Sequence, residues 1–388
     1  MKDKKNIYLL YAISFLQGLV FYGPVATLYR QAAGVSVFQI TVIESICLAL
    51  CIALEMPWGL VADRIGYRKT MIITCGIYFI SKVVFWRADG FDGFLLERIL
   101  LSVVMAGMSG CDLSILYLSC REEESQQVFG IYQSLGMAGL LFASLFYSVF
   151  IGENYRLAGF LTMIAYGVAA VLVFGLKEVK EPEKEKKSMI HFFHTFLDVV
   201  KDRYFLLGMV GITLLEETNQ TITVFLNQLQ YVKCGMEPKT MGYVFIIVTL
   251  SGIAGGMWSY RLNKKMGILP FTIVLFLCGS ISCLVLFQTK SGLLSVLGII
   301  FLRLASSLFG PLKARLQNCR VTSTDRATVL SIYAVVGEAC GTGTNLIFGK
   351  AAAADLTYAM LWGSLLCTVG GVLFVISHLK MNKITKAW

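Results

Sequence analysis

Twelve long apolar segments constrain the fold of this chain more than any other feature. Each has about 20 residues or slightly more, enough for a helix to cross a hydrocarbon layer of about 30 Å. The segments are apolar on all sides and lack the period of two expected of a membrane strand, so they predict helices and not a barrel. They lie at residues 7–29, 38–61, 70–88, 93–117, 127–150, 157–176, 204–227, 239–260, 267–288, 291–313, 327–349 and 357–379.

The composition agrees with a membrane protein. Hydrophobic residues make up 56% of the chain and charged residues only 15%, against about 25% charged residues in a soluble domain. We therefore predict an all-α polytopic membrane protein. The eleven cysteines are scattered without a metal-binding spacing, and no nucleophile or ATP-binding pattern is present. These observations predict no enzyme activity, no metal site and no cofactor.

The basic residues predict the orientation in the membrane. With a cytoplasmic amino terminus, 24 of the 34 lysines and arginines fall on the cytoplasmic side, seven fall outside and three lie within helices. This bias predicts a multi-pass protein of the cell (cytoplasmic) membrane with both termini in the cytoplasm. The net charge of +10 then indicates contact with anionic membrane lipids and not with nucleic acid.

The longest hydrophilic stretch, residues 177–203, divides the segments into six and six. It starts with a mixed-charge run and continues with apolar residues at helical spacing, which predicts a cytoplasmic linker with an amphipathic helix. A weak internal repeat supports two related halves, because the fourth and tenth segments carry Arg98 and Arg303 at equal rank. We expect one six-helix bundle at 1–176 and another at 204–388.

Residues 59–69 carry almost all the charge between the second and third segments. They read GLVADRIGYRK, with glycines that permit a turn and a close helix approach. This stretch resembles the loop between helices two and three of the major facilitator superfamily, whose pattern is G-x-L-a-D-r-x-G-r-r-k. The matching residues are Gly59, Ala62, Asp63, Arg64, Gly66, Arg68 and Lys69. A positively charged loop that only fixes topology is the simpler interpretation.

The resemblance implies a transporter with twelve helices in two pseudo-symmetric six-helix bundles and a substrate site near mid-membrane. It also implies that Asp63 latches the second helix to the eleventh, so the motif acts as a gate. The stretches at 109–117 and 311–331 resemble a branch of bacterial drug and metabolite exporters. The family's antiporter run in helix five, G-P-x-x-G-G, is absent, because residues 136–139 read GMAG without proline.

Ionisable side chains in mid-membrane are costly and need a role or a partner. A buried carboxylate could carry a coupling proton, because loss of hydration favours its neutral form. The proton-coupling candidates are Glu216, Glu217, Glu338, Asp112 and Glu44. The substrate-cavity candidates are Gln17, Phe21, Tyr22, Gln133, Asn219, Gln220, Arg303 and Asn345.

Structural interpretations compete for the central charges. Arg303 could simply neutralise Glu338 or Glu216. The adjacent Glu216 and Glu217 point about 100° apart on a helix, so we expect only one of them to face the cavity. Arg303 would shift the pKa of whichever of these carboxylates lies closest to it.

The remaining candidates also have simpler roles. Glu44 could pair with Lys82 across the second and third segments. Asp112 could be a helix-end group near the inner surface, and Gln17 and Gln133 could bond only neighbouring helices.

We predict a secondary transporter that exports an amphipathic small molecule by alternating access, coupled to protons. Proton-coupled uptake of a nutrient is the alternative within the same class. A receptor or assembly partner that does not transport is the alternative from another class; it would carry a large soluble attachment, and none is visible in 388 residues. The family is mostly monomeric, so a monomer is expected.

Overall fold

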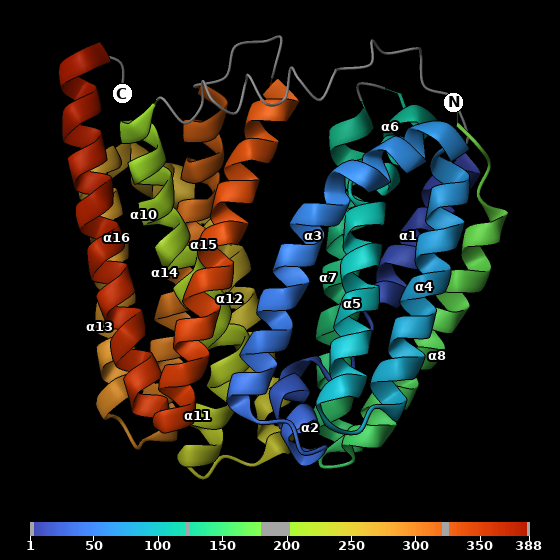
Figure 1. Ribbon diagram of the computed structural model, residues 1–388, viewed down its shortest axis with the longest axis horizontal. Helices are drawn as coiled ribbons and strands as arrows, with labels where there is room; N and C mark the ends of the chain where they lie inside the picture. Colours follow the sequence, from blue (N-terminus) through green and yellow to red (C-terminus); the bar gives the residue numbers. More distant parts are fainter. Residues whose placement is uncertain (1–3, 122–123, 180–201, 320–325, 386–388) are drawn as a thin grey trace. The chain divides into compact units, whose positions relative to one another are not determined.

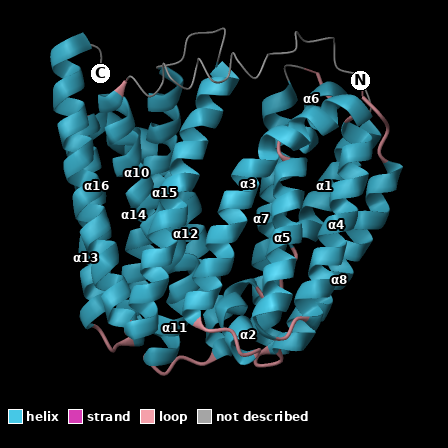
Figure 2. Cartoon of the chain, viewed as in Figure 1, coloured by secondary structure: helices cyan, strands magenta, loops and turns pink. Residues whose placement is uncertain are grey.

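A computed structural model describes residues 4–121, 124–179, 202–319 and 326–385. Within these ranges the chain forms helices joined by short turns and contains no strand (Figures 1 and 2). The predicted all-α class is confirmed. The amphipathic helix expected in the linker lies outside the described residues.

The chain divides into two compact units. The first comprises Met1–Lys184 with Pro238–Ile246, and the second comprises Glu185–Glu237 with Ile247–Trp388. The bundle boundaries expected at 176 and 204 stay a prediction.

The helices of the first unit are α1 (Lys4–Gly18), α2 (Ala26–Ala32), α3 (Val37–Ile65), α4 (Tyr67–Arg87), α5 (Gly90–Met108), α6 (Cys111–Ser119), α7 (Ser125–Phe146) and α8 (Tyr155–Leu172). Short irregular turns η1 (Gly23–Val25), η3 (Tyr147–Ile151) and η4 (Val173–Gly175) extend three of them. Helix α5 packs against α3 and α4, while α1 packs against α7 and α4 against α8 (Figure 1).

The helices of the second unit are α10 (Arg203–Gln220), α11 (Asn227–Lys233), α13 (Ile268–Gln288), α14 (Gly292–Cys319), α15 (Arg326–Ala354) and α16 (Leu356–Thr385). The π-helical turn η5 (Thr221–Leu226) joins α10 to α11, and α12 (Pro238–Met266) has its first residues in the first unit. Helix α16 packs against α10 and α13, and α15 contacts α10, α14 and α16 (Figure 1).

Each of the twelve predicted segments falls in one helix or in consecutive helices of the described chain. Ten of these stretches are long and apolar enough to cross a membrane, judged by length and composition over the described residues. The other two are the α10–α11 stretch and α15. Both carry carboxylates singled out from the sequence, Glu216 and Glu217 in one and Glu338 in the other, so their polarity belongs to the candidate site.

One predicted helix is interrupted. The segment at 93–117 is not a continuous helix, because α5 ends at Met108 and α6 starts at Cys111. Gly110 has a φ of +79°, a left-handed conformation that residues with a side chain rarely adopt. The glycine therefore ends one helix and redirects the chain into the next.

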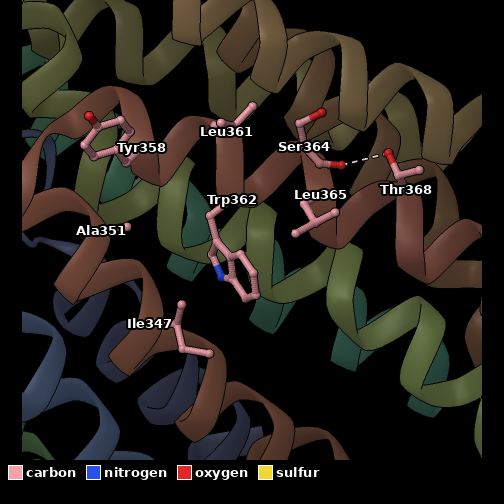
Figure 3. A pocket seen from close by; sticks show the side chains of 8 residues that line it. All are labelled: Ile347, Ala351, Tyr358, Leu361, Trp362, Ser364, Leu365 and Thr368. Atoms are coloured by element: carbon pink, nitrogen blue, oxygen red, sulfur yellow. Dashed lines mark hydrogen bonds between the residues drawn. The ribbon is translucent and has the colours of Figure 1, made fainter.

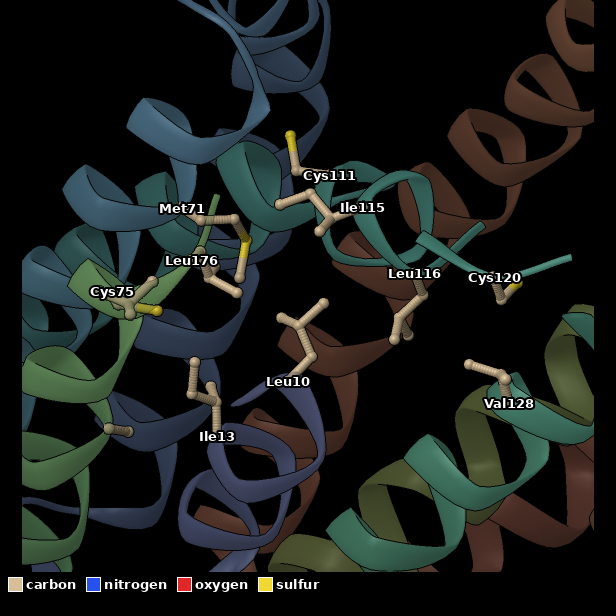
Figure 4. Packing of buried hydrophobic residues seen from close by; sticks show 12 residues of the cluster. Leu10, Ile13, Met71, Cys75, Cys111, Ile115, Leu116, Cys120, Val128 and Leu176 are labelled. Carbon is tan, nitrogen blue, oxygen red and sulfur yellow. The ribbon is translucent and has the colours of Figure 1, made fainter. Parts of the chain in front are cut away.

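The apolar core of the first unit contains buried side chains from α1, α4, α6, α7 and α8 (Figure 4). Cys75, Cys111 and Cys120 lie in it beside Leu10 and Ile115. No disulfide joins the described cysteines. These three thiols act as small packing groups.

Candidate functional site

The stretch at 59–69 is mostly helical, so the predicted loop is wrong in extent. Helix α3 continues to Ile65, and α4 begins at Tyr67. Only Gly66 forms the turn, with a φ of +86°. Leucine, alanine and arginine in this stretch are good helix formers, which explains why the helix continues to the glycine. The side chain of Asp63 lies outside the described part of the structure, so the latch stays a prediction.

Arg68 fastens this turn to the end of α8. Its Nε donates to the Leu176 carbonyl at 2.5 Å, and its Nη2 donates to the Phe174 carbonyl at 3.1 Å. In return, the carboxylate of Glu178 accepts from the backbone N–H of Arg68 at 3.2 Å. Each charged group thus satisfies backbone groups at the other helix's end. Arg64 and Lys69 are exposed.

Five charged side chains form a buried cluster in the first unit: Arg30, Glu44, Lys82, Glu97 and Arg98. Glu44 lies 2.7 Å from Arg98 and 3.1 Å from Arg30. Lys82 lies 2.9 Å from Glu97. The predicted pairing of Glu44 with Lys82 is therefore wrong.

Two residues that the sequence did not single out explain this difference. Arg30 follows directly after the predicted segment 7–29, but it lies in α2 with 1% of its surface exposed. Glu97, which is also 1% exposed, forms the ion pair with Lys82 in place of Glu44. The available signal was the charged pair at 97–98 inside an apolar segment. Glu44 neutralises two arginines here, which fits a structural role.

The aromatic candidates of the first unit are core residues in this structure. Phe21 and Tyr22 are each only 7% exposed. The Tyr22 hydroxyl accepts from Lys82 Nζ at 3.1 Å, and its ring stacks on Phe85 at 3.9 Å. The structure therefore places Tyr22 beside the charge cluster, and its predicted role in a substrate cavity stays a prediction.

The other polar candidates of the first unit bond to neighbouring helices or face outward. The carboxylate of Asp112, in the first turn of α6, accepts from the Tyr132 hydroxyl at 2.7 Å. Gln17 Nε2 lies 3.6 Å from the Cys75 sulfur. Gln133 is exposed. Asp112 and Gln17 thus have the simpler structural contacts that the sequence left open.

A polar cavity of about 420 Å³ lies between α10, α14 and α15 of the second unit. Thr213, Glu216 and Glu217 line it from one face of α10, at the i, i+3, i+4 spacing that brings side chains together. The full lining is Thr213, Glu216, Glu217, Lys313, Ala314, Gln317, Tyr333, Ala334, Gly337 and Glu338. The cavity therefore brings together three of the five proton-coupling candidates, Glu216, Glu217 and Glu338.

Lys313 interacts differently with the two adjacent glutamates. Its Nζ lies 2.5 Å from Glu216, so Lys313, and not Arg303, neutralises that carboxylate. Glu217 makes no ion pair with any residue in the described ranges, although Glu216, Lys313 and Glu338 are close enough to act on it electrostatically. Both glutamates line the cavity, so the expectation that only one would do so is wrong. The cavity is enclosed by three helices, so it extends beyond a single face of α10 and reaches both side chains.

Glu217 packs closely against α15. A Cβ placed on Gly341 would lie 2.8 Å from the carboxyl carbon of Glu217. The glycine therefore leaves room for the carboxylate beside the helix backbone. Glu338 enters the same cavity from α15, one turn before Gly341.

The remaining candidates of the second unit lie on other parts of these helices. Asn345 accepts a hydrogen bond from the Thr221 hydroxyl at 2.6 Å, and Asn219 accepts from Thr223 at 3.4 Å. Both asparagines are buried, whereas Gln220 is exposed. Arg303 lies near the middle of α14 and forms no ion pair within the described residues, so its predicted pairing with Glu216 is wrong.

A second cavity, of about 570 Å³, lies along α15 and α16 (Figure 3). Its lining is mostly apolar and includes Ile347, Leu361, Trp362 and Leu365. The lining contains no ionisable carboxylate or amine, so it does not serve as the candidate site.

Membrane-length helices around a cavity with several carboxylates define a polytopic transport protein. The sequence profile of the Major Facilitator Superfamily matches residues 7–344. The chain belongs to this family of transporters and is not an enzyme.

Solved structures agree on the fold. The nucleoside transporter NupG superposes with a TM-score of 0.76 at 16% identity, over 98% of this chain and 99% of that one. The inward-facing, unoccupied bacterial homologue of the human lysosomal transporter Spinster gives 0.73 at 15% identity, over 97% and 96%. A D-xylose–proton symporter gives 0.71 at 14%, over 97% of each chain. No curated protein sequence matches the chain significantly.

Proposed function

We propose that this chain is a proton-coupled secondary transporter that moves a small molecule by alternating access. It resides in the cytoplasmic membrane as a monomer surrounded by lipid, with both termini in the cytoplasm. The positive-inside bias of its basic residues supports this orientation.

The single observation that carries the proposal is the position of Glu217. This carboxylate faces a polar cavity, and no described cation pairs with it, whereas Lys313 neutralises its neighbour Glu216. A carboxylate held away from bulk water, next to other carboxylates, readily takes up a proton. Glu217 is therefore the coupling residue, and Glu338 shares the cavity as the second acid.

Transport in the outward direction, of an amphipathic compound, is the first version of the proposal. It rests on the likeness of 109–117 and 311–331 to bacterial exporters. Uptake is the second version. Solved structures with the same fold are described as a nucleoside transporter and a D-xylose–proton symporter, which favours testing nucleosides and pentoses. Gly136 to Gly139 lack the antiporter proline, which also favours symport.

The test uses the full chain in proteoliposomes that contain a pH-sensitive dye. A nucleoside, a pentose and an amphipathic cationic dye are each added with and without an imposed pH gradient. At least one compound should move protons with it in the wild type, and the sign of the pH change gives the direction. Glu217→Gln should abolish the proton movement.

Glu237→Gln is the matched control, because Glu237 is an exposed glutamate in the turn before α12. It should behave as the wild type does. Proton movement that survives Glu217→Gln and the double variant with Glu338→Gln would rule out this coupling route.

A further inference from the structure

Arg303 is a charged residue in the middle of a membrane-length helix, and the proposed function leaves it without a role. Within the described residues it forms no ion pair. Its neighbour across the helix contact is Gly252 of α12, where an added Cβ would lie 2.9 Å from the Arg303 Nε and 3.1 Å from the Ser307 Oγ. An unpaired guanidinium at such a depth is costly, so it needs a partner at some stage of the protein's work.

In the first unit, an arginine in a similar packing arrangement is neutralised by a carboxylate of the same unit. There, Ser102 Oγ lies 3.1 Å from the Cys47 sulfur, and Arg98 pairs with Glu44 at 2.7 Å. Arg98 and Ser102 stand four residues apart on α5, and Glu44 precedes Cys47 by three residues on α3.

The second unit repeats this arrangement at a constant spacing of 205 residues. Arg303 and Ser307 stand four residues apart on α14, and both face Gly252, which occupies the position of Cys47. The position of Glu44 is occupied by Thr249, so the second unit keeps the arginine and lacks the carboxylate. At this packing position the second unit therefore lacks the carboxylate that neutralises the arginine of the first unit.

Arg303 does not line the polar cavity, although it lies on α14, the helix that contributes Lys313 and Ala314 to it. Ala314, a cavity residue, follows Arg303 by eleven residues, which is about three helical turns, and Pro311 lies between them. The two positions are about 16 Å apart along the helix axis. Lys313, the cation in the cavity lining, is already held by Glu216. Arg303 is thus a cation of α14 that no carboxylate among the described residues neutralises.

We propose that Arg303 binds an anionic group of the transported substrate, a carboxylate or a phosphate, which takes the place of the Glu44 carboxylate in the repeat. This inference rests on the proposed transport function. Guanidinium groups match both oxyanions through two parallel hydrogen bonds, and the Ser307 hydroxyl lies beside the Gly252 contact as a further donor. The acids of the cavity carry the proton, and the arginine selects the substrate.

The test measures equilibrium binding by thermal shift with the purified full chain, so it needs no gradient. The probes are matched pairs: benzoate and benzyl alcohol, glutarate and 1,5-pentanediol, ribose 5-phosphate and ribose. The wild type should be stabilised by at least one anion and not by its neutral partner. Comparing the carboxylate probes with the phosphate probe shows which oxyanion binds.

Three variants test the assignment to Arg303. Arg303→Gln should weaken anion binding about tenfold or more, the usual loss when one partner of a charge-assisted contact is removed. Thr249→Glu should restore the internal pair and block anion binding, while the neutral Thr249→Gln should not. Arg315→Gln is the control, because Arg315 is an exposed arginine on the same helix.

Two results would overturn the inference: no anion stabilises the wild type more than its neutral partner, or the stabilisation persists in Arg303→Gln. Thermal unfolding of the ligand-free variants reports separately whether each one folds. Anion binding without proton movement would reject the proposed coupling and retain the Arg303 site. Proton movement with a neutral compound alone would do the reverse.

Discussion

Lys313 of α14 lies 2.5 Å from the carboxylate of Glu216 on α10, so one of two adjacent glutamates is neutralised and the other is not. Both side chains of the pair are about one quarter exposed, at 27% and 26%. The contact holds two helices together at the cavity wall. It also gives Glu216 and Glu217 different electrostatic surroundings, although the two residues are adjacent in the sequence.

A double-mutant cycle can measure this contact. Lys313→Gln should lower the thermal stability, because it leaves Glu216 charged next to Glu217. Glu216→Gln in that background should recover part of the loss, with a coupling energy of about 0.5–3 kcal/mol, as for other contacting pairs. Thermal unfolding of the four proteins in one detergent gives the value. Additive effects of the two substitutions would show that the contact contributes nothing.

A second prediction concerns the charge cluster of the first unit. Glu44→Gln leaves Arg30 and Arg98 without their shared carboxylate, and breaking a buried pair in this way costs about 3–5 kcal/mol. We expect a large fall in melting temperature and in the yield of folded protein. Arg30→Gln in addition should restore part of both. A Glu44→Gln protein as stable as the wild type, with altered proton coupling, would instead return Glu44 to the coupling candidates.

A third prediction concerns the turn between α3 and α4. Gly66→Ala must place a side chain at a φ of +86° and a ψ of 156°, a region that essentially only glycine occupies, at a cost of about 1–3 kcal/mol. The new Cβ would also lie 3.0 Å from the Glu178 carboxyl group that caps α4. We expect a lower melting temperature. Gly76→Ala, in open space within α4, is the control and should be neutral or slightly stabilising.

The sequence predicted the helices and much of the candidate site, for identifiable reasons. Membrane helices satisfy their own backbone hydrogen bonds, so the apolar segments are local signals that need no tertiary information. Glu216, Glu217 and Glu338 were found because a carboxylate within such a segment is costly anywhere. The structure brings these three into one cavity.

The partners of these charges could not be predicted in the same way. A pairing depends on which helix faces meet, and periodicity along one helix does not contain that information. Lys313 was expected at the end of its segment, and Arg30 in a loop, yet both neutralise buried or half-buried glutamates. The extent of α3 was missed because a charged motif suggested a loop, whereas only Gly66 has a backbone conformation that ends the helix.

A fourth prediction separates the role of Glu217 from its contribution to folding. In Gly341→Ala, the new methyl group would lie 2.8 Å from the Glu217 carboxyl and must displace it. The displaced group is the end of a flexible side chain, so the melting temperature should change little. If Glu217 carries the coupling proton, its new environment should shift the pH at which transport is half-maximal.

The control is Gly343→Ala on the same helix, where an added Cβ meets nothing within 4 Å. It should leave both the melting temperature and the pH profile unchanged, because alanine is the better helix former and touches no charged group. A pH profile that is identical in Gly341→Ala and Gly343→Ala would mean that proton uptake is insensitive to the position of Glu217. Another acid, such as Glu338, which enters the cavity from α15, would then carry the coupling.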